Sequence, residues 1–230
     1  MATASKKQAP AQSQPMRRAY SLMRRRFGHR HWWPAETPFE VCVGAILTQN
    51  TAWSNVERAI ANLKAAGVLE PNKLYALSEA RLAALIRLAG YYNVKARRLR
   101  AFLRVLVEEF GGRLERLFAG ETNAVRQRLL AVCGIGPETA DSMLLYAGGH
   151  HRFVIDAYTR RIFHRHGWSG EHVPYDELQQ LCESALAHQP RRARLDYWQD
   201  YHAQLVHTGH EFCRNRRPRC AECPLNPLLP

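Results

Sequence analysis

The apolar residues of this chain recur with the period of an α-helix from residue 37 onward, and this pattern constrains the fold more than any other feature. Phe39, Cys42 and Ile46 show the spacing that places side chains on one helix face. The alternation typical of a β-strand is nearly absent, with residues 152–155 as its one short candidate. Breaks in the helical pattern fall at Gly67, Pro71, Gly90 and Gly111-Gly112. The sequence therefore predicts an all-α protein of about ten short helices.

Composition and charge narrow the class of protein further. The chain has 230 residues, 46% of them hydrophobic, which is enough for one large or two small domains with a substantial core. No apolar run approaches the roughly 20 residues of a membrane-spanning helix, so we expect no membrane protein. The formal net charge is +13, and 28 of the 33 basic residues are arginine, whose planar guanidinium suits phosphate. We therefore expect a polyanionic partner.

The cysteines and the N-terminus indicate a reducing, intracellular compartment. Cys42, Cys133 and Cys182 lie in apolar helical patterns and are predicted to be buried, whereas the other three crowd into the last 18 residues. A secreted disulfide framework would spread its cysteines over a shorter chain. Residues 1–16 lack the apolar segment of a signal peptide, and we interpret them as a disordered basic tail.

Two glycines divide a predicted pair of helices near the middle of the chain. The apolar end of one helix is followed by Gly134-Ile135-Gly136-Pro137, and proline is favoured at the first position of the next helix. Backbone N–H groups at such a turn can bind a phosphate with help from the helix dipole. An ordinary helix–turn–helix connection with a glycine cap fits the same pattern equally well.

A carboxylate and a group of tryptophans are further candidates for function. Asp156 follows the apolar pair Val154-Ile155 and precedes a helical run, so it can cap a helix and also hold a carboxylate rigidly. The run Trp32-Trp33-Pro34 precedes the first core helix, and Trp53 follows the segment that contains Gln49. Core packing and an aromatic cage for a ligand are both open for these rings.

Together these elements resemble the helix-hairpin-helix DNA glycosylases of the endonuclease III superfamily, in the same order, from about residue 17 to 230. Residues 47–51 (Leu-Thr-Gln-Asn-Thr) resemble the segment with which members of this family reach the space left by an extruded base. Residues 134–136 match the hairpin, and residues 154–156 match the segment of the catalytic aspartate. The pattern Cys213-x6-Cys220-x2-Cys223 matches the start of the family's iron–sulfur loop. One departure is Val132-Cys133, where the family usually has Leu-Pro.

The resemblance implies base excision on double-stranded DNA that contains damaged bases, by a monomeric, cytoplasmic and nucleoid-associated enzyme. Such an enzyme flips the damaged nucleotide out of the stack. Asp156 would be catalytic, because it would stabilise positive charge on the sugar or orient a water. Contacts to DNA would come from a loop residue that fills the gap and from the hairpin, namely Gln49, Gly134, Ile135, Gly136 and Thr139.

A second departure bears on mechanism. Members of the family that also cleave the strand have a lysine after the hairpin, which forms a Schiff base, and this chain has Glu138 there. We therefore expect a monofunctional glycosylase with water as the nucleophile. Glu138 fits two interpretations, an acidic residue at a helix N-terminus or a residue of the base pocket.

Three motifs together resemble the 3-methyladenine DNA glycosylase branch, namely the Trp-Trp-Pro run at 32–34, Thr-Gln-Asn-Thr at 48–51 and Gly-Pro-Glu-Thr-Ala-Asp-Ser at 136–142. Alkylated purines carry positive charge, which favours an electron-rich aromatic pocket by about 0.5–2 kcal/mol. The expected base pocket comprises Trp32, Trp33, Pro34, Trp53 and Glu138. The alternatives are a glycosylase with AP lyase activity on oxidised pyrimidines and a non-catalytic DNA-binding or redox-sensing protein.

The cofactor expectation stays open. A [4Fe–4S] cluster prefers four thiolates, and Leu229 occupies the position of the family's fourth cysteine. His207 or His210 could supply a nitrogen ligand to Cys213, Cys220 and Cys223. A loop without metal and a zinc bound by three cysteines and one histidine are the other outcomes.

The expected architecture has two helical lobes with a DNA-binding cleft between them. One lobe is a helical barrel over residues 36–149 that ends in the helix-hairpin-helix motif. The other combines residues 17–29 with residues 150–230, including the C-terminal cysteine loop.

Overall fold

The computed structural model describes residues 13–230 and divides them into two compact units. One unit is formed by Trp33–Arg152, and the other by residues 13–32 together with Phe153–Pro230. The described residues contain helices and no strand, which confirms the all-α prediction. The candidate strand at 152–155 is an extended connection, because its backbone groups bond to side chains rather than to another strand. No helix in this part of the chain is long and apolar enough to cross a membrane.

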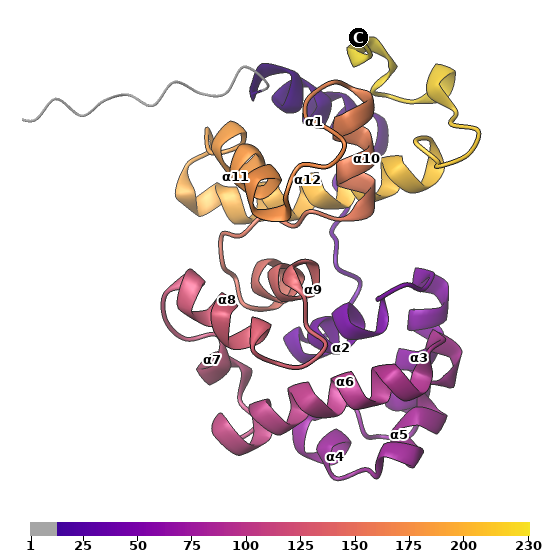
Figure 1. Cartoon of the computed structure of the whole chain (residues 1–230), viewed down its shortest axis with the longest axis vertical. Helices are drawn as coiled ribbons and strands as arrows, with labels where there is room; N and C mark the ends of the chain where they lie inside the picture. The colour runs from indigo at the N-terminus through magenta and orange to yellow at the C-terminus, as the bar shows by residue number, and fades with distance from the viewer. Residues whose placement is uncertain (1–12) are drawn as a thin grey trace, which may run out of the picture. The chain divides into compact units, whose positions relative to one another are not determined.

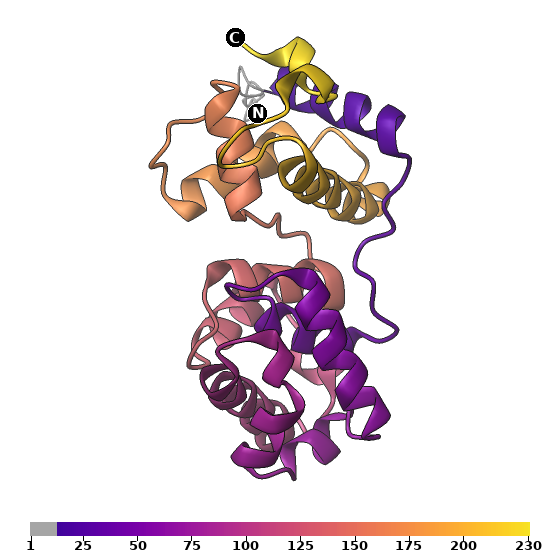
Figure 2. The same ribbon diagram turned by 90° about the vertical axis from the view of Figure 1, so that its right-hand side faces the viewer.

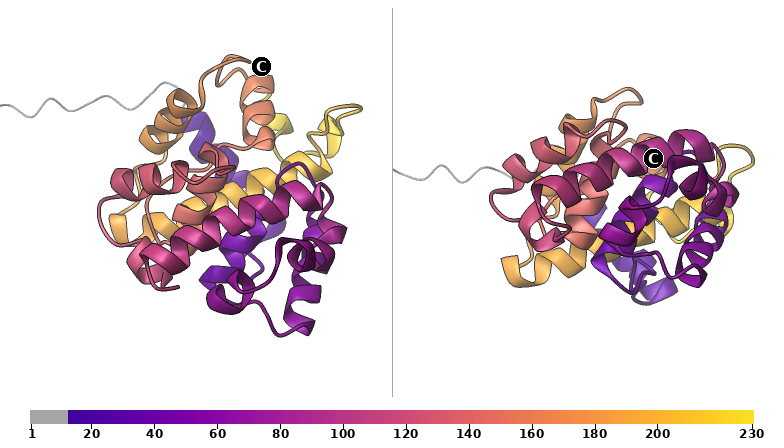
Figure 3. Two further views of the ribbon diagram at one scale, coloured as in Figure 1. Left: turned by 60° about the horizontal axis from the view of Figure 1, so that its bottom comes forward. Right: turned by 90° about the horizontal axis from the view of Figure 1, so that it is seen from below.

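The unit Trp33–Arg152 is built around one long helix, α6. Figures 1 and 3 show α6 crossing this unit, and α2, α4 and α5 pack against it. Its buried face carries Leu99, Phe102 and Leu103, which join a continuous hydrophobic core. The helices are α2 (Pro38–Leu47), α3 (Trp53–Ala65), α4 (Pro71–Tyr75), α5 (Glu79–Leu85), α6 (Tyr92–Arg104), α7 (Leu114–Leu117), α8 (Thr122–Leu130) and α9 (Pro137–Ser142). A short helix η1 (Arg87–Ala89) precedes α6, and the π-helical turns η2 (Val105–Glu109) and η3 (Met143–Ala147) extend α6 and α9.

The second unit is organised by its longest helix, α12. Figure 2 shows α1 lying beside α12, and α10 packs on α12 as well. Its elements are α1 (Ser13–Phe27), α10 (Ala157–Arg165), α11 (Tyr175–Ala185), α12 (Arg191–Glu211) and the short helices η4 (Cys220–Glu222) and η5 (Asn226–Leu228).

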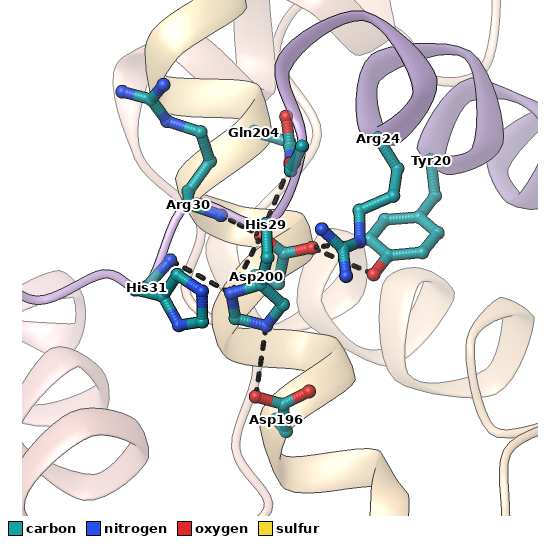
Figure 4. Close-up of polar contacts among 9 residues, drawn as sticks. Tyr20, Arg24, His29, Arg30, His31, Asp196, Asp200 and Gln204 are labelled. Carbon is teal, nitrogen blue, oxygen red and sulfur yellow. Dashed lines mark hydrogen bonds and ion pairs between the residues drawn. The ribbon is translucent and has the colours of Figure 1, made fainter.

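A buried carboxylate joins α12 to the N-terminal part of this unit. Asp200 on α12 is 1% exposed and accepts hydrogen bonds from the Tyr20 hydroxyl and the Arg30 backbone N–H, each at 2.8 Å (Figure 4). The Gln204 amide donates to the same carboxylate at 3.2 Å and to the Gly28 carbonyl at 2.7 Å. Burial, together with Asp200, raises the pKa of Tyr20. These bonds fix the chain where it leaves α1.

Two sequence predictions need correction here. Residues 13–16 begin α1 instead of belonging to the tail, because Met16 is fully buried and Pro15 lies in the first turn, where proline is tolerated. Residues 1–12 of the predicted tail lie outside the described residues. Cys42 and Cys182 are buried as predicted, but Cys133 is exposed because it lies in the turn after α8.

The close packing of α10 on α12 leads to a test of this unit. A Cβ at Gly209 on α12 would lie 2.5 Å from Cδ1 and 2.6 Å from Cβ of Tyr158 on α10. Gly209→Ala should therefore lower the free energy of unfolding by about 1–3 kcal/mol, as measured by urea denaturation. Gly170→Ala is the control, since its nearest contact is an ordinary 3.5 Å to Val173. Equal stability of the two variants would show that α12 can move away from α10 at little cost.

Candidate functional site

A network around Gln49 brings together several residues that the sequence singled out. Gln49 follows the end of α2, and its Nε2 donates to the Gly134 carbonyl at 3.0 Å and to the Thr139 Oγ1 at 2.9 Å. Its Oε1 accepts a hydrogen bond from Arg98 on α6. The loop after α2 and the glycine turn before α9 are therefore held together by one amide and one guanidinium.

The two glycines of the turn have different roles in the fold. Gly134 has a φ of 86°, and a Cβ there would lie 2.3 Å from Cγ of Arg98, so both the backbone and the packing require glycine. Gly136 has a φ of −95°, and a Cβ there would meet nothing within 4 Å. The protein itself therefore does not require glycine at position 136.

The turn leaves backbone donors available at the start of α9. The Ile135 N–H donates to the Val132 carbonyl at 3.0 Å, and its side chain is 5% exposed and belongs to the core. Ile135 thus anchors the turn. The N–H groups of Gly134 and Gly136 donate to no acceptor within residues 13–230. These amides, beside a helix start that carries partial positive charge, can bind an anion.

A buried lysine that the sequence analysis did not single out holds a second pair of loops. The Lys95 Nζ on α6 is buried and donates to the carbonyls of Leu47 and Ala89, each at 2.7 Å. Burial, with a smaller contribution from Arg98, lowers the pKa of Lys95 to about 8. Since Leu47 ends α2, this ammonium fixes the start of the Gln49 loop. A charged residue four positions before the buried Leu99 on one helix was the available signal in the sequence.

The turn beside that loop presents an aromatic ring to solvent. Tyr91 is 73% exposed and has a φ of 45°, a left-handed conformation that is rare for a bulky residue. Leu88 and Val94 on either side are also exposed. A strained backbone that displays an exposed tyrosine suits contact with a partner. No local sequence pattern marks this exposed ring, because a tyrosine next to Gly90 fits a buried helix start equally well.

Two of the predicted pocket tryptophans lie together. The rings of Trp33 and Trp53 meet edge to face with centroids 5.3 Å apart, and Tyr146 meets Trp33 at 5.4 Å. Gly44 on α2 allows this packing, since a Cβ there would lie 3.2 Å from the Trp33 Nε1. All three rings are partly exposed. Tyr146 lies far from both tryptophans in the sequence, so no local pattern linked it to them.

The other three residues predicted for the base pocket are Trp32, Pro34 and Glu138, and each has different surroundings. Pro34 is exposed beside Trp33, whereas Trp32 belongs to the other unit. Glu138 is exposed in the first turn of α9, which is where an acidic residue stabilises a helix. One turn further along α9, buried Asp141 accepts two bonds from Arg126, at 2.8 and 3.2 Å, and thereby ties α9 to α8.

Asp156 is held rigidly in the second unit. It has extended backbone angles and caps α10, with its Oδ1 accepting from the Thr159 N–H at 2.7 Å. The preceding residues are tied to α11, since the Phe153 N–H donates to Glu183 at 3.0 Å and the Ile155 N–H donates to the Tyr175 hydroxyl at 3.3 Å. The Asp156 side chain is 11% exposed. The carboxylate is therefore buried, preorganised and still reachable.

The C-terminal cysteines line a small apolar cavity. Cys213, Cys220 and Cys223 share it with Leu229 and His166, whose Nδ1 lies 3.0 Å from the Leu228 carbonyl. Arginine holds the loop, because the Arg165 guanidinium donates to the carbonyls of Arg214 at 2.8 Å and Asn215 at 3.2 Å.

These residues do not fit the four-thiolate cluster that the resemblance implied. Leucine stands at the fourth ligand position and lines the same cavity. Within the described part of the chain, no three histidine, cysteine or acidic side chains are grouped so that they could hold a metal ion.

Comparisons with known proteins agree with this geometry. The model of the HhH-GPD superfamily of base excision DNA repair proteins matches residues 43–188. A Methanocaldococcus jannaschii protein provisionally named a DNA repair glycosylase is 45% identical over 207 residues, which cover 90% of this chain and 91% of that protein. The structure of H. pylori 3-methyladenine DNA glycosylase bound to 1,N6-ethenoadenine has a TM-score of 0.75 at 28% identity and covers 86% of this chain and 97% of that one. A non-covalent endonuclease III–DNA complex has the same fold, with a TM-score of 0.77 at 21% identity and 94% of each chain covered.

The two glycines of the turn provide a matched pair of variants. Gly134→Ala should lower the free energy of unfolding by about 1–3 kcal/mol, because it forces alanine into a left-handed conformation against Arg98. Gly136→Ala should change it by less than about 0.5 kcal/mol, since its φ is ordinary and the space is open. Thermal and urea unfolding of both variants measure the difference. An equal loss in both would contradict the different roles assigned to them.

Proposed function

The chain belongs to the HhH-GPD superfamily of base excision DNA repair proteins, and on that premise we propose that it is a monofunctional DNA N-glycosylase that releases alkylated purines such as 3-methyladenine. Its partner is double-stranded DNA that contains a damaged base, bound by one copy of the chain inside the cell. The observation that carries the proposal is the buried, capped and partly accessible carboxylate of Asp156.

The chemistry follows from the charge that develops as the base leaves. Breaking the glycosidic bond puts positive charge on the sugar, and a fixed carboxylate stabilises that charge without having to reorganise. Asp156 meets this requirement, because the Thr159 N–H already fixes one of its oxygens. The cationic base leaves with the electron pair of the glycosidic bond as a neutral purine, and water adds to the sugar carbon and releases one proton to solvent. An alkylated purine already carries positive charge, so it needs little assistance as a leaving group.

The contacts of the three lysines in the described part of the chain support water as the nucleophile. Lys95, the last lysine of the chain, is buried with its ammonium on two carbonyls. Lys64 pairs with Glu36 and Glu40, and Lys73 pairs with Glu70. Position 138, which follows the hairpin, carries a carboxylate that cannot form an imine.

Binding to DNA is assigned to the hairpin and to the loops beside it. The free amides of Gly134 and Gly136 would hold a phosphate without reading sequence. Alanine at position 136 would place a methyl group where the phosphate approaches, although the fold tolerates it. Tyr91 would stack on a base, since its ring is exposed and every base offers an aromatic face.

The aromatic cluster supports the choice of substrate. Trp33, Trp53 and Tyr146 form an electron-rich group whose rings are partly exposed. Such a group attracts a cationic purine more than a neutral damaged pyrimidine. The similar H. pylori structure holds a modified adenine, which is consistent with this choice. No step of the proposed reaction uses an iron–sulfur cluster.

Substitution of the carboxylate tests the catalytic assignment. Asp156→Asn should lower the single-turnover rate of base release at least about 100-fold, because the amide carries no charge to stabilise the sugar cation. Asparagine caps helices as well as aspartate does, so the fold and the affinity for DNA should be retained. Exposed Asp176 in the first turn of α11 provides the control variant Asp176→Asn, which should behave like the wild type. Full activity of Asp156→Asn would remove this residue from the mechanism.

A product analysis tests the substrate and the absence of strand cleavage. Duplexes that carry 3-methyladenine, thymine glycol or uracil are incubated with the protein, with and without later alkali. We expect release of the alkylated base only, strand breaks only after alkali, and no covalent adduct on addition of borohydride, because each lysine within residues 13–230 is engaged with carbonyls or carboxylates. Breaks before alkali on thymine glycol, or a trapped adduct, would instead identify a glycosylase with lyase activity.

A further inference from the structure

A histidine on α12 lies beside the carboxylate of Asp156. The Nε2 of His202 is 3.7 Å from Oδ2 of Asp156, and the two side chains are only 5% and 11% exposed. Phe153 packs its ring edge to face with the imidazole, at a centroid distance of 6.3 Å. The other carboxylate oxygen, Oδ1, accepts the N–H of Thr159. One oxygen is thus fixed by the helix cap, and the other faces the histidine.

The packing of α10 on α12 determines this juxtaposition. Gly209 lies seven residues after His202 and therefore on the same face of α12, where it allows Tyr158 to approach closely. Near the same end of α12, the Arg161 guanidinium donates to the Gly209 carbonyl at 3.1 Å and to the Cys213 carbonyl at 2.5 Å. The helix pair is fixed at this end. Two turns earlier on α12, His202 lies beside Asp156 at the start of α10.

A histidine at this position is costly for a site that needs only packing. Burial lowers the pKa of the His202 imidazole, and the smaller opposing effect of the Asp156 charge only partly offsets this lowering. A phenylalanine of similar size would fill the space without removing a polar ring from water. The neutral imidazole can present an N–H toward the carboxylate without adding a positive charge that would compete with a sugar cation. Burial, and then Asp156, raise the pKa of the Tyr158 hydroxyl on α10, and the Arg161 guanidinium lies 5.1 Å from the centre of the Tyr158 ring.

We propose that His202 is a positioning residue for Asp156, in which the imidazole beside Oδ2 holds the carboxylate in the orientation needed to face the sugar of the everted nucleotide. The inference rests on the proposed function, because it assigns His202 a role only if Asp156 acts on that sugar. It adds to the catalytic site a residue from a helix that the sequence places 46 positions further along.

Two variants separate positioning from packing. His202→Phe keeps an aromatic ring but removes the N–H, and we expect the single-turnover rate of base release to fall about tenfold or more, with unchanged affinity for lesion-containing duplex. His202→Gln keeps an N–H near the Nε2 position and should recover most of the rate. His207→Phe is the control, because His207 is also on α12 but packs on Phe27, at 4.6 Å. A wild-type rate in His202→Phe, or no recovery in His202→Gln, would overturn the proposal.

A titration keeps the test valid if His202→Phe does not fold. NMR titration of His202 in the wild type and in Asp156→Asn should show a lower imidazole pKa in the variant, because the charge that raises it is gone. The pKa of His207 should not change. An unchanged pKa of His202 would show that the two groups are not coupled and would overturn the proposal. If the wild type releases no base from any lesion, the proposed function fails, and that outcome is distinct from a wild-type rate in His202→Phe.

Discussion

Two cations one turn apart on α6 hold together the loops of the unit formed by residues 33–152. Lys95 bonds to the carbonyls at the end of α2 and at the end of η1, and Arg98 bonds to Gln49, which in turn binds the turn before α9. Three segments that are far apart in the sequence therefore depend on one helix face. Because Lys95 is removed from water, its hydrogen bonds are stronger than surface contacts, and loss of either partner would leave a buried polar group unsatisfied.

The unit that contains Asp156 uses a carboxylate for the same purpose. The Asp200 carboxylate accepts hydrogen bonds from the Tyr20 hydroxyl, the Arg30 backbone N–H and the Gln204 amide. The Nε of Arg24 lies 3.4 Å from its Oδ2. A buried carboxylate with so many donors fixes the geometry of its neighbours rather than adding net stability. The same helix carries His202 two residues further on, so α12 supports both the chain that leaves α1 and the start of α10.

Periodicity and glycine placement predicted the helical class and the position of the hairpin, because both are local properties. The helix start at Ser13 was missed because Ser13-Gln14-Pro15 reads as a break, although Met16, Ala19 and Met23 already show helical spacing. The surroundings of the candidate site were less accessible to sequence reasoning. Arg98 bonds to Gln49, Tyr146 packs on Trp33, and His202 lies beside Asp156, each through packing between helices that are distant in the sequence, and no local pattern marks such partners. Cys133 was misjudged because the apolar pattern that contains it ends one residue earlier, at buried Val132.

The turn at Gly134–Gly136 is already set by Arg98, Gln49 and the buried side chain of Ile135, yet its two glycine amides have no acceptor in the described chain. The loop is thus rigid and chemically incomplete at the same time. A ligand that completes it would find the two backbone donors in place. Binding of an anion at this point would therefore cost little conformational entropy, because the backbone that supplies the donors is already ordered by its own side chains.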